Sequence, residues 1–271
     1  MMREKYFQRE DCRIHYTVTG KGQPVVLLHG FAEDGTIWQD QILFLRQHCL
    51  LIVPDLPGSG GSSILTKENA TVEDYAECVH ALLEFENIDK CILLGHSMGG
   101  YITLAFAEMF PDKLAAFGFV HSTAVADNEE KRNTRKKAIK LIEEYGVYPF
   151  IKNTIPNLFS DTFKKDHPER VAKFIDKGRK FSKEALIQYY TAMINRPDRS
   201  DVLKNSGVPV LFIIGSEDVA IPLEDLLKQV HLPKISFIHI IFDVGHMSMW
   251  ENSGELNTHL LEFIKNCSLQ V

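Results

Sequence analysis

The chain has 271 residues, of which 45% are hydrophobic and 24% charged, and it carries a formal net charge of −6 at pH 7. This composition is typical of a globular protein and excludes a disordered chain. The length allows one large domain or one domain with an insertion, and the negative charge argues against nucleic acid as the main partner.

The first ten residues, MMREKYFQRE, contain no apolar stretch of signal-peptide length, so we expect a cytoplasmic protein. No apolar run approaches the roughly 20 residues that cross a bilayer, and we expect no membrane partner.

Residues 12–18 alternate between apolar and polar side chains, which predicts a strand with one buried face. Six later apolar runs predict strands covered on both faces, as in a parallel sheet: 24–29, 49–54, 91–94, 115–120, 210–214 and 235–242.

Segments with helical spacing separate these runs, at 37–45, 71–85, 97–109, 223–230 and 255–264. Thr71, with Asp74 three residues later, is close to a capping box and predicts the start of a helix. Because strand and helix alternate almost throughout, the sequence predicts an α/β fold with a doubly wound, mainly parallel sheet.

The alternation breaks between residues 125 and 200, where the pattern predicts helices only. This stretch holds 17 Lys/Arg and 11 Asp/Glu, a net charge of +6, whereas the remainder has a net charge of −12. We therefore expect a helical cap over residues 125–200, inserted into a core of residues 1–124 and 201–271. The basic charge indicates either solvated helix faces attracted to an acidic body or a preference for anionic substrates.

Cysteine spacing gives no indication of a disulfide framework or a zinc site, because the count is odd and no CxxC pair occurs. We expect reduced thiols, mostly packed in the core. The five positions are Cys12, Cys49, Cys78, Cys91 and Cys267.

The stretch LLGHSMGG at 93–100 places a polar cluster between a strand-like run and a helical pattern. Gly95-x-Ser97-x-Gly99 fits the nucleophile elbow, a tight strand-to-helix turn at which flanking side chains would collide with their neighbours. The same geometry leaves the backbone N–H of Met98 at a helix start, where it can stabilise negative charge. The alternative interpretation is a turn without chemistry.

A serine nucleophile needs a base and an acid, and the loops after the last strand-like runs supply candidates. His246, in FDVGHMSMW, is the predicted base. His121, which ends the strand before the insertion, is its rival and a candidate substrate contact. Asp218 is the favoured acid because it follows a buried strand in a loop, with Asp243 and Asp127 as the alternatives.

Two further features complete the predicted site. His29-Gly30-Phe31 follows a strand-like run, so the backbone N–H of Phe31 can join that of Met98 in an oxyanion hole. Apolar side chains of the predicted cap are candidates for a substrate pocket: Tyr148, Phe150, Phe159, Phe163, Phe174, Tyr189, Tyr190 and Met193. We single out Tyr148, Phe159 and Tyr190 as substrate-binding residues.

Together these motifs resemble those of the α/β-hydrolase fold superfamily, in the family's order and over nearly the whole chain. They are HGF at 29–31, DLPGSGGSS at 55–63, GHSMGG at 95–100, GSEDVAIP at 215–222 and VGHM at 244–247. The chain is most similar to the compact esterase, lactonase and non-haem haloperoxidase-like branch. That resemblance implies an eight-stranded sheet, a helical cap between strands 6 and 7, and acyl transfer without a cofactor or metal.

From these residues we expect a serine hydrolase that acts on a small to medium carboxylic ester, thioester or lactone through an acyl-enzyme intermediate. Three alternatives stay open: a carbon–carbon bond hydrolase of ring-fission products, a haloperoxidase-like perhydrolase, and a non-catalytic ligand receptor on the same fold. Dehalogenases and epoxide hydrolases of this fold have an aspartate nucleophile, so Ser97 disfavours those chemistries. The expected partner is a small molecule, and the sequence leaves the oligomeric state open.

Overall fold

The computed structural model describes residues 2–268, and within them eight strands form one sheet in the order β1-β2-β4-β3-β5-β6-β7-β8. The strands are β1 (Arg3–Gln8), β2 (Arg13–Gly20), β3 (Pro24–Leu28), β4 (Leu50–Pro54), β5 (Cys91–His96), β6 (Leu114–Val120), β7 (Val210–Gly215) and β8 (Ser236–Ile241). β2 pairs antiparallel with β1 and β4, and the other pairs are parallel. The predicted eight-stranded, mainly parallel sheet is confirmed.

Strand β1 has no counterpart among the predicted strands. It pairs with β2 alone, from Arg3 opposite Val18 to Gln8 opposite Arg13. None of its residues is fully buried, and its sequence REKYFQ lacks the apolar run that marks the central strands. A polar sequence of this kind is usual on an edge strand, where charged side chains discourage pairing with other chains.

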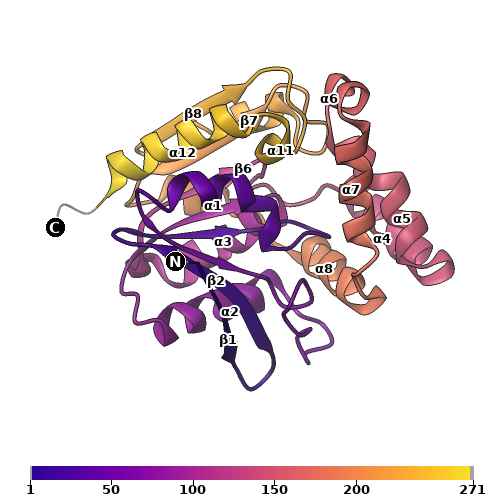
Figure 1. The fold of residues 1–271 in the computed structure, drawn as a ribbon, viewed down its shortest axis with the longest axis horizontal. Coiled ribbons are helices and arrows are strands. Elements are labelled where there is room, and N and C mark those ends of the chain that lie inside the picture. The colour runs from indigo at the N-terminus through magenta and orange to yellow at the C-terminus, as the bar shows by residue number, and fades with distance from the viewer. Residues whose placement is uncertain (1, 269–271) are drawn as a thin grey trace.

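Helices cover both faces of the sheet (Figure 1). One pair of packed helices is α1 (Gln39–Leu45) with α12 (Ser253–Cys267), and another is α2 (Val72–Phe85) with α3 (Met98–Met109). The shorter segments outside the insertion are η1 (Gly35–Trp38), η2 (Pro111–Lys113), α10 (Leu223–Leu227) and α11 (Ser248–Glu251). All five cysteines are buried free thiols. This layered arrangement is the doubly wound fold that the alternation of strand and helix predicts.

The segment between β6 and β7 is helical, as its pattern predicts. It contains α4 (Glu129–Tyr145), α5 (Val147–Thr154), η3 (Ile155–Leu158), α6 (Asp161–Asp166), α7 (Pro168–Gly178), α8 (Lys183–Asn195) and α9 (Ser200–Lys204). In Figure 1, α4 to α7 gather beside one end of the sheet, with α8 between them and the strands. The division into a cap of residues 125–200 and a surrounding core stays a prediction.

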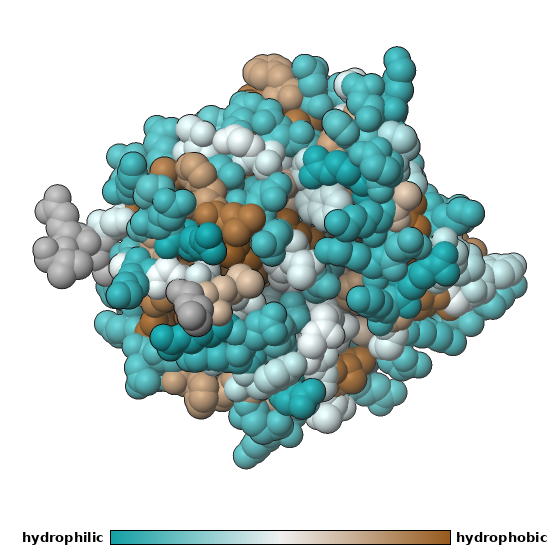
Figure 2. Space-filling view, viewed as in Figure 1, coloured by the Kyte–Doolittle hydropathy of each residue, from teal (hydrophilic) through white to brown (hydrophobic). Residues whose placement is uncertain are grey.

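The face of the molecule seen in Figure 2 is largely hydrophilic, with apolar side chains in small separate patches. Within residues 2–268, none of the helices combines the length and the apolar composition that a bilayer-spanning helix requires.

Helix α2 begins with a capping box, and this feature gives the first testable prediction. Asp74 N donates to Thr71 Oγ1 at 3.4 Å, and Thr71 N donates to the Asp74 carboxylate at 2.7 Å. We expect Thr71→Ala to lower the free energy of unfolding by about 1 kcal/mol, because it removes an acceptor for a free helical N–H. Denaturant unfolding measures this loss. Thr162→Ala, at an exposed position, is the control, and equal stability of the two variants would contradict the prediction.

Candidate functional site

Ser97 occupies a strained turn between β5 and α3. Its backbone has φ of 49° and ψ of −115°, a conformation that costs a non-glycine residue about 1 to 3 kcal/mol. A Cβ atom on Gly99 would lie 2.7 Å from the carbonyl oxygens of Leu28 and His29, and one on Gly95 would collide with the Gly99 backbone. The two flanking glycines are therefore required by close backbone approach, which is the reason the sequence pattern gives for them.

Two backbone amides lie beside Ser97. Met98 N is at the first position of α3, where a helix leaves its N–H groups unpaired. A Cβ atom on Gly30 would lie 3.1 Å from Ser97 Cβ, so the turn that carries Phe31 closely approaches the serine. Neither the Met98 nor the Phe31 amide has an acceptor among residues 2–268. Both are free to donate to a ligand oxygen, as the predicted oxyanion hole requires.

The Asp218 carboxylate is held by hydrogen bonds on both oxygens. Oδ1 accepts from the backbone N–H groups of Ala220 and Ile221, each at 2.9 Å. Oδ2 lies 2.7 Å from His246 Nδ1 and 3.1 Å from His121 Nδ1. Burial alone would raise the pKa of this carboxyl, but electrostatic attraction to His246 and the hydrogen bonds of both imidazoles hold it well below its usual value. Asp218 is therefore ionised at neutral pH.

Neither alternative acid is hydrogen-bonded to His246 among the described residues. Asp127 bonds Arg135 and Arg196, and Asp243 is exposed two residues after the end of β8. The structure thus brings Asp218 to the histidine and leaves the other two carboxylates elsewhere.

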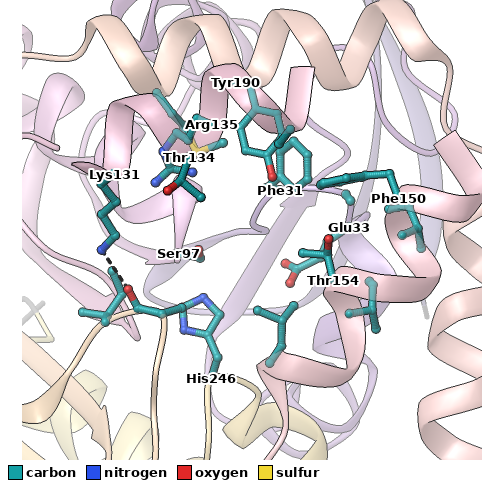
Figure 3. A pocket seen from close by; sticks show the side chains of 18 of the residues that line it. Phe31, Glu33, Ser97, Lys131, Thr134, Arg135, Phe150, Thr154, Tyr190 and His246 are labelled. Atoms are coloured by element: carbon teal, nitrogen blue, oxygen red, sulfur yellow. Dashed lines mark hydrogen bonds between the residues drawn. The ribbon is translucent and has the colours of Figure 1, made fainter. Parts of the chain in front are cut away.

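Ser97 and His246 line the same cavity, which has a volume of about 270 Å³ (Figure 3). Because Nδ1 of His246 is bonded to Asp218, Nε2 is the ring nitrogen left for chemistry in this cavity. The Ser97 hydroxyl forms no hydrogen bond with the imidazole among the described residues. Such bonds are often long or poorly aligned until a substrate binds.

His121, a predicted substrate contact, lies beneath the site and is absent from the cavity wall. Its side chain is fully buried, and its Nε2 is 2.7 Å from Ser248 Oγ. Burial lowers the pKa of His121 to about 4, so the ring is neutral near pH 7. A neutral imidazole has one N–H, which serves Asp218 at Nδ1, and Nε2 then accepts from the Ser248 hydroxyl. His121 therefore donates a hydrogen bond to the Asp218 carboxylate and does not line the cavity.

A buried ion pair that the sequence did not predict adjoins the cavity. Glu33 Oε2 lies 2.9 Å from His96 Nδ1 and accepts the Gly30 N–H at 2.5 Å, and His96 Nε2 is 3.0 Å from the His246 carbonyl oxygen. Although burial disfavours both charges, their mutual attraction lowers the pKa of Glu33 and raises the pKa of His96. The pair ties the turn before Phe31 to the loop of His246.

The cavity wall is mostly apolar, and only part of the predicted aromatic lining contributes to it. Tyr190 lines the cavity and stacks on Phe31 with a ring-centroid distance of 4.2 Å. Phe159 instead stacks on Phe163, and Tyr148 packs under the Arg179 guanidinium at 3.7 Å. Neither lines the cavity. Phe150 and Met193, two other candidates for the apolar lining, do line the cavity. Ile151 was missed, because its helical spacing does not distinguish it from an ordinary packing residue.

Some side chains have the spacing of metal ligands. Within the described residues, three clusters bring potential ligand atoms within 4.8 Å of one another: Asp11, Cys12 and Cys78; His121, Asp218 and His246; and His239, His259 and Glu262. In the second cluster the facing atoms are engaged in the two Nδ1 to Oδ2 hydrogen bonds described above. The expectation that the site works without a metal or cofactor stays a prediction.

Comparisons with known proteins show what the chain resembles. A sequence model of the family described as alpha/beta hydrolase fold matches residues 23–138. A 2-hydroxy-6-oxononadienedioate/2-hydroxy-6-oxononatrienedioate hydrolase of Paraburkholderia phymatum is 27% identical over 267 residues, which cover 94% of this chain and 91% of the relative.

Solved structures resemble the chain over nearly all of its length. A thermophilic esterase from Thermogutta terrifontis, with malate bound, has a TM-score of 0.92 and 27% identity, covering 98% of this chain and 100% of that chain. An enol-lactonase from Burkholderia xenovorans has a TM-score of 0.89 and covers 96% of this chain and 100% of that chain. Its identity is 20%, so this likeness concerns the fold alone.

The buried state of His121 predicts a pH-dependent contribution to stability. Its folded pKa of about 4 lies below the unfolded value of about 6.5, so the stabilisation is complete above pH 6.5 and is lost as the pH falls towards 4. We expect this loss to reach about 3 kcal/mol at the acid end. His121→Gln, which does not titrate, removes this component from the pH dependence of the unfolding free energy.

Denaturant unfolding of both proteins between pH 4 and 7.5 tests the prediction. His231→Gln, at an exposed position, is the control and should parallel the wild type. If the wild-type and His121→Gln curves also run parallel, His121 does not titrate as stated.

Proposed function

The chain is a member of the α/β-hydrolase superfamily, and we propose that it is a serine hydrolase that acts on a small to medium carboxylic ester, thioester or lactone. One observation carries the proposal: the strained Ser97 and the His246 imidazole that is bonded to Asp218 line a single cavity. An alcohol, a base and an ionised acid in this order are the components of serine acyl transfer.

The proposed reaction has two halves. His246 Nε2 takes the hydroxyl proton of Ser97, and Ser97 Oγ attacks the carbonyl carbon to form a tetrahedral oxyanion that the amides of Phe31 and Met98 bind. Collapse of this intermediate breaks the bond to the leaving group, which receives the proton from His246. Water, deprotonated by the same nitrogen, then attacks the acyl-enzyme to give a second tetrahedral oxyanion. Its collapse breaks the bond to Ser97 Oγ, which receives the proton back from His246, and releases the carboxylic acid.

Asp218 supports each proton transfer electrostatically. It keeps the Nδ1 proton of His246 in place, so that Nε2 is the basic nitrogen, and it stabilises the imidazolium that forms in each half-reaction. His121 and the amides of Ala220 and Ile221 fix the carboxylate itself. In this proposal they are positioning groups that do not touch the substrate.

The substrate class is supported by the cavity and by a relative. A mostly apolar space of about 270 Å³ suits an acyl group of small to medium size. The Thermogutta terrifontis structure at 27% identity is described as an esterase. An ester, thioester or lactone each places an electrophilic carbonyl carbon where Ser97 can attack it.

A second candidate is hydrolysis of an unsaturated oxo-dicarboxylic acid by cleavage of a carbon–carbon bond. Two relatives, at 25% and 27% identity over more than nine-tenths of this chain, are named as hydrolases of 2-hydroxy-6-oxononadienedioate. A panel of simple acyl esters, lactones and such a dienedioate distinguishes the two candidates. Turnover of the dienedioate with negligible ester hydrolysis would favour the second.

The assignment of Ser97 predicts a covalent adduct. A fluorophosphonate probe should label the wild type at Ser97, because the activated hydroxyl attacks phosphorus as it would a carbonyl carbon. Ser97→Ala should lose both labelling and ester hydrolysis, measured by mass spectrometry and by p-nitrophenyl release. Ser122→Ala is the control, because it removes a neighbouring hydroxyl that donates to the Ser97 carbonyl oxygen and is not the proposed nucleophile. This variant should keep both labelling and hydrolysis. Full hydrolysis by Ser97→Ala would refute the assignment.

The assignment of Asp218 predicts a large kinetic defect. Asp218→Asn should lower kcat by about 10⁴-fold, because an amide at this position no longer stabilises the imidazolium or holds the required tautomer. Asp243→Asn changes an exposed carboxylate near the same loop and should keep kcat within about twofold. Comparable losses in both variants, measured in steady-state kinetics, would argue against Asp218 as the acid.

A further inference from the structure

One face of helix α4 brings polar and cationic groups to the cavity. Lys131, Thr134, Arg135 and Ala138 all line it, and their spacing places them on the same side of the helix. Figure 3 shows the first three together on one wall of the cavity. The other helices of the insertion contribute mainly apolar side chains to the cavity, including Phe150 and others described above.

Arg135 is only partly neutralised by its neighbours. It contacts both oxygens of Asp127, with Nε 2.6 Å from Oδ2 and Nη2 3.4 Å from Oδ1, but Oδ1 also accepts from Arg196 Nη2 at 2.9 Å. One carboxylate therefore serves two guanidinium groups, and one positive charge is left over. The Arg135 guanidinium also lies 5.7 Å from the ring centroid of Tyr190, another residue of the cavity wall.

Lys131 has no acidic partner among the described residues. Its Nζ donates to the carbonyl oxygen of Ala220 at 2.8 Å, and an ammonium group can donate three hydrogen bonds. Asp218, in the same loop, is bonded to two imidazoles and two amides. Asp225, across a neighbouring groove that Lys131 also lines, is paired with Lys228 at 2.8 Å.

One acidic residue, Glu33, lines the cavity, and its partner is His96 rather than a residue of α4. Glu33 is ion-paired with His96 at 2.9 Å, and Figure 3 shows it on the opposite side of the cavity from Lys131. Their mutual attraction lowers the pKa of Glu33 and raises the pKa of His96, which favours the charged form of each group beside the other. The α4 wall thus carries positive charge that the protein leaves unbalanced.

We propose that Lys131, with Arg135 beside it, binds a free carboxylate on the substrate, so that the preferred substrate is an ester or lactone with a second, ionised carboxyl group. This inference rests on the proposed function, since it adds a specificity to the same cavity. In a mostly apolar cavity, a charge-assisted hydrogen bond from an ammonium to a carboxylate is about twice as strong as a neutral one. The carboxylate also supplies the counter-charge that the α4 wall lacks.

Two p-nitrophenyl esters that differ only at the far end of the acyl chain test the inference. The monoester of adipate ends in a carboxylate, and the hexanoate ends in a methyl group. We expect the wild type to have the higher kcat/KM for the adipate monoester. Lys131→Gln, which keeps a donor for the Ala220 oxygen but removes the charge, should reduce the adipate-to-hexanoate ratio of kcat/KM about tenfold, chiefly through KM.

Matched variants separate specificity from folding. Lys136→Met removes a positive charge from an exposed position of the same helix and should keep the wild-type ratio. Lys131→Arg keeps the charge and should restore most of the adipate preference, while Lys131→Met provides a second neutral variant. Thermal unfolding checks that each variant is folded.

The outcomes distinguish the inference from the function on which it rests. The inference would be overturned if the wild type showed no preference for the adipate monoester, or if Lys131→Gln lost kcat/KM equally for both esters. The second result would mean that Lys131 only connects α4 to the Ala220 loop and does not bind the substrate. If Ser97 is still labelled and hexanoate still hydrolysed, the serine hydrolase proposal survives that failure. Absence of labelling and of turnover for both esters would overturn both.

Discussion

The arrangement of the site depends on the hydrogen bonds that the buried carboxylate of Asp218 accepts. This carboxylate joins three strand ends of one sheet edge: its own loop after β7, His121 at the end of β6, and His246 in the loop after β8. A buried anion is costly unless every oxygen is satisfied, and here four donors satisfy the two oxygens. Because Lys131 bonds the Ala220 carbonyl of the same loop, the position of α4 is also coupled to this anchor.

The strands and the serine turn could be predicted because their causes are local. Central parallel strands are buried on both faces, so each appears as an apolar run, and the tight turn at Ser97 requires the glycines beside it. Strand β1 was not predicted, because an edge strand needs no apolar face. The proximity of Asp218 and His246 could likewise be predicted, because the ends of neighbouring parallel strands meet at one edge of the sheet.

What the sequence could not predict depends on side-chain direction and on contacts between distant segments. Glu33 and His96 are separated by 63 positions, and nothing in either neighbourhood marks them as partners. His121 does end a strand at the correct edge, but its backbone, with φ of 54°, is part of a turn whose side chain packs beneath the cavity. The same limit applies to Tyr148 and Phe159, whose helical positions give no information about which neighbour each ring meets.

The backbone at Ser97 also restricts which reactive groups this fold can use at that position. A positive φ of 49° is tolerated by side chains with a single substituent on Cβ, whereas a β-branched residue such as threonine would be a severe outlier there. Cysteine or aspartate could therefore take the place of serine without rebuilding the turn. The turn therefore accepts side chains that would change the type of reaction, but it excludes threonine, the other residue with an aliphatic hydroxyl group.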